Sequence, residues 1–362
     1  MKGGIVESAE IMRQKEKLSD RLQESRFPPA ALIGAFSSFV AAVFRHQPES
    51  RAQSIPAPGL VQIDFAPRPA SAPPQTRLEL NYSRVLVIGG PGATLPFRRS
   101  LLGIAAGPGD LIYALGDDEV RVFNSDGNPA GNWKTPAGAL CLTVSPDKRV
   151  FLGFPGRVEI YASGGHRTGV FSVGEPGRPA RVTAIKTFGS EILIADAEER
   201  YIRRCDAEGK QIGAVGTQSK TGGFMLPNRA LDMDISGDGV ILAADSGRHR
   251  VTSWALDGKA LGHFGKFGLR DTEDFVGCCN PVNLAVTPEG NVVTAEKVVA
   301  RVKVYNHDGR LLALIGPEHF DPKCTHLHLA VDSKGRILVA DPVQLQITGF
   351  SPVPGPGGRE IA

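Results

Sequence analysis

The sequence predicts an all-β fold, a six-bladed propeller, and three observations lead to it. A short apolar strand, a turn and a second apolar strand recur six times, about 40 to 50 residues apart, which is the interval of propeller blades. Glycine or Asp-Gly turns join the strands of each copy. One copy alone is a small sheet with two faces to bury, and stacking copies around an axis covers both faces.

The central strands of the six copies align along the chain. They begin at Leu111, Val150, Ile192, Ile241, Val292 and Ile337. The sixth copy ends at Phe350 without a fourth strand, because the tail 351–362 is rich in proline and glycine. An apolar strand ahead of the first copy, at 84–89, resembles the fourth strands at 260–265 and 311–316. We therefore expect this strand to complete blade six and close the ring, which removes an exposed sheet edge.

Five segments are expected along the chain. A charged leader with a short helix, residues 1–26, precedes a hydrophobic segment at 27–44. A linker rich in proline and alanine follows at 45–77, then the propeller at 78–352 and a flexible tail at 353–362. The repeated prolines prevent a helix or a central strand from forming in the linker, so we expect a semi-rigid tether.

The hydrophobic segment 27–44 carries no charge. As a transmembrane helix it would be about 27 Å long, near the lower limit for a bilayer span. Lysine and arginine are concentrated ahead of it, which favours a cytoplasmic N-terminus and an extracytoplasmic, periplasmic propeller on a single-pass membrane anchor. A cleaved signal peptide and a buried amphipathic segment are the alternatives.

The overall charge argues against nucleic-acid binding. The formal net charge is +3 over 362 residues, and the chain has no block of lysine and arginine that would follow a phosphate backbone. We therefore expect no nucleic-acid partner.

The first strand of each blade is expected to line a central channel. One equivalent position on the six inner strands is occupied by Leu102, Cys141, Thr183, Asp232, Asn283 and His328. Most of these are polar or metal-coordinating residue types, which are unusual in a packed core and common in a wet channel.

A cluster of cysteine and histidine is expected at the channel mouth. Its members are Cys278 and Cys279 before blade five, and Cys324, His326 and His328 before blade six. Strand alternation places the last three on one face, and thiolates with imidazoles suit copper, zinc or iron. The alternatives are a Cys279 to Cys324 disulfide, a disulfide between the adjacent cysteines, or neither, since the spacing matches no standard zinc motif.

Two charged residues follow the central strand of blade five. Glu296 stands where Asp196, Asp245 and Asp341 stand in other copies, and we expect it to cap the following turn rather than to catalyse a reaction. Lys297, where other copies have a small residue, is a candidate anion contact.

The repeats at 284–296 (LAVTPEGNVVTAE) and 329–341 (LAVDSKGRILVAD) resemble those of the NHL-repeat family. The resemblance covers roughly 78–350 and is strongest in the last three blades, whereas blade two departs from it at 153–156. The segment 277–281 (GCCNP) is similar to one in a bacterial exported subgroup. The family includes protein-binding, RNA-binding and sensor domains and a zinc-dependent lyase acting on peptidyl-hydroxyglycine, so the resemblance implies the fold and not one function.

These observations favour a membrane-tethered, extracytoplasmic propeller that binds a protein or a small molecule or senses a ligand, with a metal centre at the channel mouth. The alternative is an extracytoplasmic metal-dependent enzyme, a lyase or an oxidoreductase. The lyases of the family take their zinc ligands from separate blades, whereas His326 and His328 lie on one blade, which counts against a lyase. No catalytic residue is identified, and the sequence leaves the ligand, the metal and the oligomeric state open.

Overall fold

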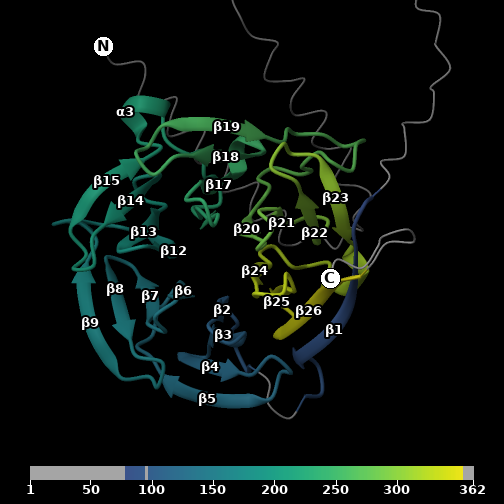
Figure 1. Ribbon diagram of the computed structural model, residues 1–362, viewed down its shortest axis with the longest axis horizontal. Helices are drawn as coiled ribbons and strands as arrows, with labels where there is room; N and C mark the ends of the chain where they lie inside the picture. Colours follow the sequence, from purple (N-terminus) through teal and green to yellow (C-terminus); the bar gives the residue numbers. More distant parts are fainter. Residues whose placement is uncertain (1–77, 94–96, 354–362) are drawn as a thin grey trace, which may run out of the picture. The chain divides into compact units, whose positions relative to one another are not determined.

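The computed structural model describes residues 78–93 and 97–353, which form six four-stranded antiparallel sheets arranged in a ring (Figure 1). The predicted six-bladed propeller is confirmed. From the channel outward, blade one contains β2 (Gly103–Gly107), β3 (Leu111–Gly116), β4 (Glu119–Phe123) and β5 (Pro129–Lys134). Blade two contains β6 (Cys141–Val144), β7 (Val150–Phe154), β8 (Arg157–Tyr161) and β9 (Arg167–Ser172).

Blades three to five repeat this order. Blade three contains β12 (Val182–Phe188), β13 (Glu191–Asp196), β14 (Tyr201–Cys205) and β15 (Gln211–Val215). Blade four contains β16 (Met233–Ile235), β17 (Ile241–Asp245), β18 (Arg250–Trp254) and β19 (Ala260–Phe264). Blade five contains β20 (Asn283–Val286), β21 (Val292–Glu296), β22 (Arg301–Tyr305) and β23 (Leu311–Ile315).

Blade six contains β24 (His328–Val331), β25 (Ile337–Asp341), β26 (Gln346–Val353) and, as its outermost strand, β1 (Asn81–Gly89). Five short elements lie in connections between the blade strands. They are the two-stranded pair β10 (Gly174–Glu175) and β11 (Arg178–Pro179), the helix α3 (Gln218–Thr221), and the 3₁₀ turns η2 (Ser246–Arg248) and η3 (Pro317–His319).

The ring closes through the N-terminal strand, as predicted. Strand β1 pairs antiparallel with β26, from Asn81 opposite Val353 to Gly89 opposite Gln346. The prediction that the last strand ends at Phe350 is wrong, because β26 continues to Val353 along β1. Pro352 is tolerated there, since β25 pairs only as far as Phe350 and β26 has a single neighbour beyond that point.

The core of the propeller lies between the blades. The second strands β7, β17, β21 and β25 are buried along their whole length, because a neighbouring blade covers each face of the sheet. The buried apolar residues form six clusters, and each cluster joins one pair of neighbouring blades around the ring. The cluster between blades six and one includes Leu86 and Ile88 of β1 together with Phe97, Leu101 and Ile104. Closure by β1 therefore supplies hydrophobic packing as well as backbone hydrogen bonds.

An Asn-x-x-Gly turn brings neighbouring blades close together. In blade five, Asn306 Oδ1 accepts hydrogen bonds from the N–H groups of Asp308 and Arg310, at 3.1 and 2.8 Å. Gly309 has φ +82°, and a Cβ atom there would lie 2.3 Å from Cβ of Phe264 in blade four. Glycine is required at this position both by the backbone conformation and by the adjacent blade.

The carboxylates that end the central strands have different roles in different blades. Asp196 and Asp341 accept hydrogen bonds from backbone N–H groups two and three residues further on, as expected of turn caps. Glu296 does not cap its turn, which corrects the prediction. Its longer side chain accepts a hydrogen bond from Val276 N at 3.0 Å and pairs with Arg301 and Lys303, at 3.0 and 2.7 Å.

The predicted leader 1–26, hydrophobic segment 27–44 and linker 45–77 lie outside the described residues, as does the tail after Val353. Within the residues that the structure describes, no helix is long and apolar enough to cross a membrane.

Candidate functional site

The six equivalent inner-strand positions face one cavity. Its volume is about 280 Å³. Leu102, Cys141, Thr183, Asp232, Asn283 and His328 all line it. Because each blade contributes one of these residues, the cavity lies on the propeller axis, where the inner strands meet (Figure 1).

Three of the polar channel residues bind the backbone of the next blade. Thr183 Oγ1 donates a hydrogen bond to the Leu231 carbonyl at 2.7 Å and accepts one from Leu231 N at 3.1 Å. In the same way, Asp232 Oδ2 accepts from Leu284 N at 2.7 Å, and Asn283 Oδ1 accepts from Leu329 N at 2.8 Å. These side chains therefore connect blades three to six as well as lining the channel. We call the hydrogen bonds made by Thr183, Asp232 and Asn283 the inter-blade bonds of the channel.

Lys186 of β12 also lines the cavity, and its ammonium group forms an ion pair. Lys186 Nζ lies 2.9 Å from Asp234 Oδ1. Burial opposes the charge of Lys186, but Asp234 and Asp232 outweigh it and raise the lysine pKa. Burial raises the pKa of Asp232 to about 7, so this carboxyl group is partly protonated at neutral pH. Burial also raises the pKa of Cys141 to about 12, which keeps its thiol neutral.

His326 and His328 lie together on the cavity wall. Their ring centroids are 4.7 Å apart. Burial, together with the positive charge of Lys297, lowers the pKa of His326 to about 4. Burial and the neighbouring His326 lower the pKa of His328 as well. Both imidazoles are therefore neutral at pH 7, and each offers one hydrogen-bond donor and one acceptor.

The cysteines predicted to join these histidines are placed differently. Cys278 is exposed, Cys279 is buried, and their sulfur atoms are 3.2 Å apart. Lys297 Nζ, predicted as an anion contact, lies 3.2 Å from Cys279 Sγ. The hydrogen bond from Cys279 lowers the pKa of Cys278, whereas burial raises the pKa of Cys279.

Cys324 is not part of the channel wall. It is 1% exposed in the core cluster between blades five and six, where burial raises its pKa to about 12. The described residues contain no group of three or more His, Cys, Asp or Glu side chains arranged to hold a metal ion. Of the five residues predicted as a metal cluster, Cys278 lies against Cys279 and His326 against His328, while Cys324 lies in the core. The five cysteines, Cys141, Cys205, Cys278, Cys279 and Cys324, are all free thiols in the structure, which contains neither of the two disulfides considered as alternatives.

Two arginines at the cavity were missed in the sequence. Arg181 and Arg229 line both the channel cavity and an adjoining cavity of about 330 Å³. Arg229 pairs with Glu198 at 2.8 Å, whereas Arg181 Nε donates to the Arg229 carbonyl at 3.1 Å. Among the described residues, the Arg181 guanidinium has no carboxylate partner. Each arginine precedes the inner-strand position of its blade by two or three residues, a signal that could have identified them.

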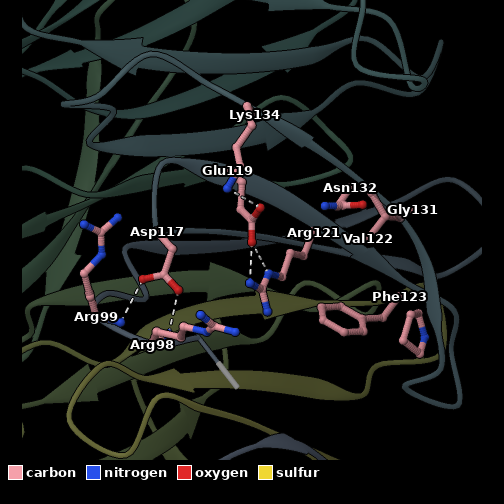
Figure 2. A pocket seen from close by; sticks show the side chains of 11 residues that line it. Arg98, Arg99, Asp117, Glu119, Arg121, Val122, Phe123, Gly131, Asn132 and Lys134 are labelled. Carbon is pink, nitrogen blue, oxygen red and sulfur yellow. Dashed lines mark hydrogen bonds and ion pairs between the residues drawn. The ribbon is translucent and has the colours of Figure 1, made fainter. Parts of the chain in front are cut away.

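A separate cavity of about 860 Å³ lies on blade one (Figure 2). Asp117 accepts hydrogen bonds from the backbone N–H groups of Arg98, Arg99 and Ser100, at 2.5 to 2.9 Å. Glu119 pairs with Arg121 and with Lys134, the latter at 2.9 Å. Both carboxylates of this cavity are therefore occupied by contacts within the protein, and those of Asp117 attach the segment before β2 to blade one.

No family model and no curated protein matches the sequence. Several solved structures share the fold. A Bacteroides thetaiotaomicron protein of unknown function is 16% identical with a TM-score of 0.55, and 76% of this chain and 77% of that chain are covered. A streptogramin B lyase is 11% identical with a TM-score of 0.50, covering 76% of this chain and 98% of that chain. The WD40 propeller domain of Doa1 is 15% identical with a TM-score of 0.50, covering 69% and 78%. At these identities the similarity shows the propeller fold alone, which is consistent with a binding module.

Proposed function

We propose that the propeller is a binding module whose ligand is a small molecule with an anionic group, held in the channel cavity. The observation that carries this proposal is the convergence of all six inner strands on one polar cavity, with Arg181 at its edge. Propellers commonly bind ligands where their blades converge. The cavity volume of about 280 Å³ is at the lower end of the range for small-molecule sites. The Arg181 guanidinium offers hydrogen bonds and charge to a carboxylate.

The lowered pKa values of His326 and His328 favour a role in ligand binding over one in acid–base catalysis. A general base works best when its pKa is close to the operating pH. His326, with a pKa of about 4, is a weak base at pH 7, because burial and Lys297 disfavour its protonated form. Neutral imidazoles that both donate and accept hydrogen bonds suit the recognition of a polar ligand instead.

The geometry does not support the alternative function, a metal-dependent enzyme. A catalytic zinc site uses three protein ligands. In the part of the chain that the structure describes, His326 and His328 have no third cysteine, histidine or carboxylate in a metal-binding arrangement. The donor set therefore does not fit the zinc site of the lyases that belong to the NHL-repeat family.

Binding can be tested with a pair of probes of one shape and different charge. We expect calorimetry of the full-length chain to detect succinate and not succinamide, because only succinate pairs with Arg181. Replacing Arg181 by Gln should weaken succinate binding by about tenfold or more, the usual contribution of a charged hydrogen bond. Arg178→Gln is the matched control, since Arg178 pairs with Glu199 and lines only the adjoining cavity. Equal binding of the two probes, an unchanged Kd in R181Q, or no binding at millimolar succinate would contradict the proposal.

The propeller is proposed to act outside the cytoplasm on a membrane tether. Support comes from the sequence alone: the uncharged segment 27–44, the lysines and arginines ahead of it, and the proline-rich linker. The five free cysteines do not decide the compartment, since three of them are buried singly and form no pair.

Protease treatment of intact cells with a permeabilised outer layer tests this topology. We expect the propeller to be degraded while an epitope placed before Phe27 stays protected. The same protease added after complete lysis is the control and should remove both. Protection of the propeller in intact cells would place it in the cytoplasm and contradict the tether orientation.

A further inference from the structure

The adjacent cysteines before blade five are held in contact with each other. The Sγ atoms of Cys278 and Cys279 are 3.2 Å apart. Cys278 is exposed to solvent, whereas Cys279 is 3% exposed. An accessible thiol therefore lies directly against a thiol that solvent does not reach.

Lys297, directly after β21, contacts the buried member of the pair. Lys297 Nζ lies 3.2 Å from Cys279 Sγ. Asn280 fixes Lys297 in place, because its Oδ1 accepts a hydrogen bond from Lys297 N at 2.9 Å and its Nδ2 donates to Lys297 O at 3.0 Å. On the other side, the His249 ring of blade four lies 2.7 Å from the Gly277 carbonyl. The cysteine pair and the ammonium group are thus held by contacts from two blades.

The other cysteines of the propeller lack the contacts of this pair. Cys141, Cys205 and Cys324 are buried, and none of them has a second thiol or a lysine as a hydrogen-bond partner among the described residues. Structural cysteines are typically buried in apolar surroundings, whereas reactive ones are accessible and lie beside a positive charge. Among the five cysteines, Cys278 alone is exposed, and its neighbour Cys279 lies between Cys278 and the Lys297 ammonium group.

We propose that Cys278 and Cys279 form a thiol–disulfide exchange site for low-molecular-weight disulfides. The Cys278 thiolate attacks one sulfur of the disulfide, a mixed disulfide forms on Cys278, and the first small thiol leaves. Cys279 then attacks Cys278 Sγ, a disulfide forms between the adjacent cysteines, and the second small thiol leaves. Two electrons pass from the protein to the disulfide, and the two cysteine protons end on the two released thiols.

The geometry divides the two steps between the two cysteines. Cys278 can meet a disulfide in solution because it is exposed, whereas Cys279 can reach only Cys278. The second step requires the thiolate of Cys279; burial raises the pKa of this thiol, and the Lys297 ammonium opposes that shift. The positive charge of Lys297 also contributes to the lowered pKa of His326 in the channel cavity, so the exchange site and the proposed ligand cavity are linked electrostatically.

The test uses the reduced full-length chain with an excess of glutathione disulfide, followed by alkylation of the remaining thiols and mass spectrometry of the intact chain and its peptides. We expect the wild type to lose two thiols, with a disulfide linking Cys278 and Cys279 and no glutathione retained. Cys279→Ser should stop at one glutathione on Cys278. Cys278→Ser should react at least about tenfold more slowly, since the accessible thiolate is absent.

Lys297→Gln should slow resolution, so that glutathione stays on Cys278 for longer, and Lys297→Arg should restore the rate. Cys205→Ser is the control and should behave as the wild type; circular dichroism checks that each variant is folded. A wild-type chain that keeps a stable glutathione on Cys278, or a C278S chain that loses thiols at the wild-type rate, overturns the proposal. A chain that loses no thiol at all also overturns it.

Discussion

A chain lacking residues 81–89 is expected to lose the cooperative unfolding transition of the whole propeller, although only one of its strands is removed. Deletion leaves β26 as an unpaired edge and removes Leu86 and Ile88 from the cluster between blades six and one. Truncation of one buried leucine or isoleucine to alanine already costs about 2 to 5 kcal/mol. Two such losses together with the lost backbone pairing approach the total stability of a typical domain, about 5 to 15 kcal/mol.

Single substitutions on β1 test the contribution of side-chain packing without removing any part of the chain. Ile88→Ala should lower the free energy of unfolding by about 2 to 5 kcal/mol, as measured by urea denaturation. Val87→Ala is the matched control on the same strand, because Val87 is 49% exposed on the opposite face, and its effect should stay within about 1 kcal/mol. A deletion variant that melts at the temperature of the intact chain would show that the ring does not depend on closure by β1.

The second large effect is expected at Glu296. This carboxylate pairs with Lys303 at 2.7 Å and with Arg301 at 3.0 Å, and the side chains of Glu296 and Lys303 are fully buried. Glu296→Gln leaves Lys303 as a buried charge without a carboxylate, which costs about 3 to 5 kcal/mol. Glu191→Gln, which breaks the more exposed pair with Arg204, should cost about 1 kcal/mol or less. Equal losses of stability in E296Q and E191Q would show that burial does not determine how much an ion pair contributes to stability.

The pH dependence of this variant follows from the acidity of Lys303. Burial lowers the pKa of Lys303 to about 8, from 10.5 in an unfolded chain, although Glu296 opposes the shift. Between about pH 8 and 10.5 the unfolded chain holds more protons, so the contribution of Lys303 to stability rises with pH. Once Lys303 is neutral, it no longer forms an ion pair with Glu296, so replacing Glu296 lowers the free energy of unfolding by less. We therefore expect the stability difference between E296Q and the wild type to narrow from pH 7 to pH 9.5.

The arrangement of strands could be predicted from the sequence because it depends on local patterns. Each blade repeats its apolar strands and turns, so the six inner positions could be aligned without the structure. Closure was predictable because the apolar segment that became β1 resembles the fourth strands and blade six lacked one. These features depend on which residues alternate along a strand, and a single sequence contains that information.

The roles of the polar residues could not be predicted in the same way. Asp232 and Asn283 were expected to face a wet channel, yet each also binds the backbone of the next blade, and both uses require the same residue types. Lys303 was not identified as buried, because its partner Asp274 O comes from the loop before blade five, about 30 residues away in sequence. The alignment of Cys279 with Cys324 did not predict their contacts, because Cys324 is buried in the cluster between blades five and six, whereas Cys279 contacts Cys278 and Lys297.

The inter-blade bonds of the channel limit how its specificity can be redesigned. Thr183, Asp232 and Asn283 each use an oxygen atom to bind the next blade, so changing the surface they present to a ligand also weakens the junction between two blades. The Leu102 and His328 side chains form no inter-blade hydrogen bond among the described residues, and Cys141 forms only a weak one, at 3.7 Å, to Val182. Leu102 and His328 can therefore be replaced without breaking an inter-blade hydrogen bond, whereas Cys141 is packed in the core cluster between blades two and three. An engineer seeking a new ligand would begin with blades six and one.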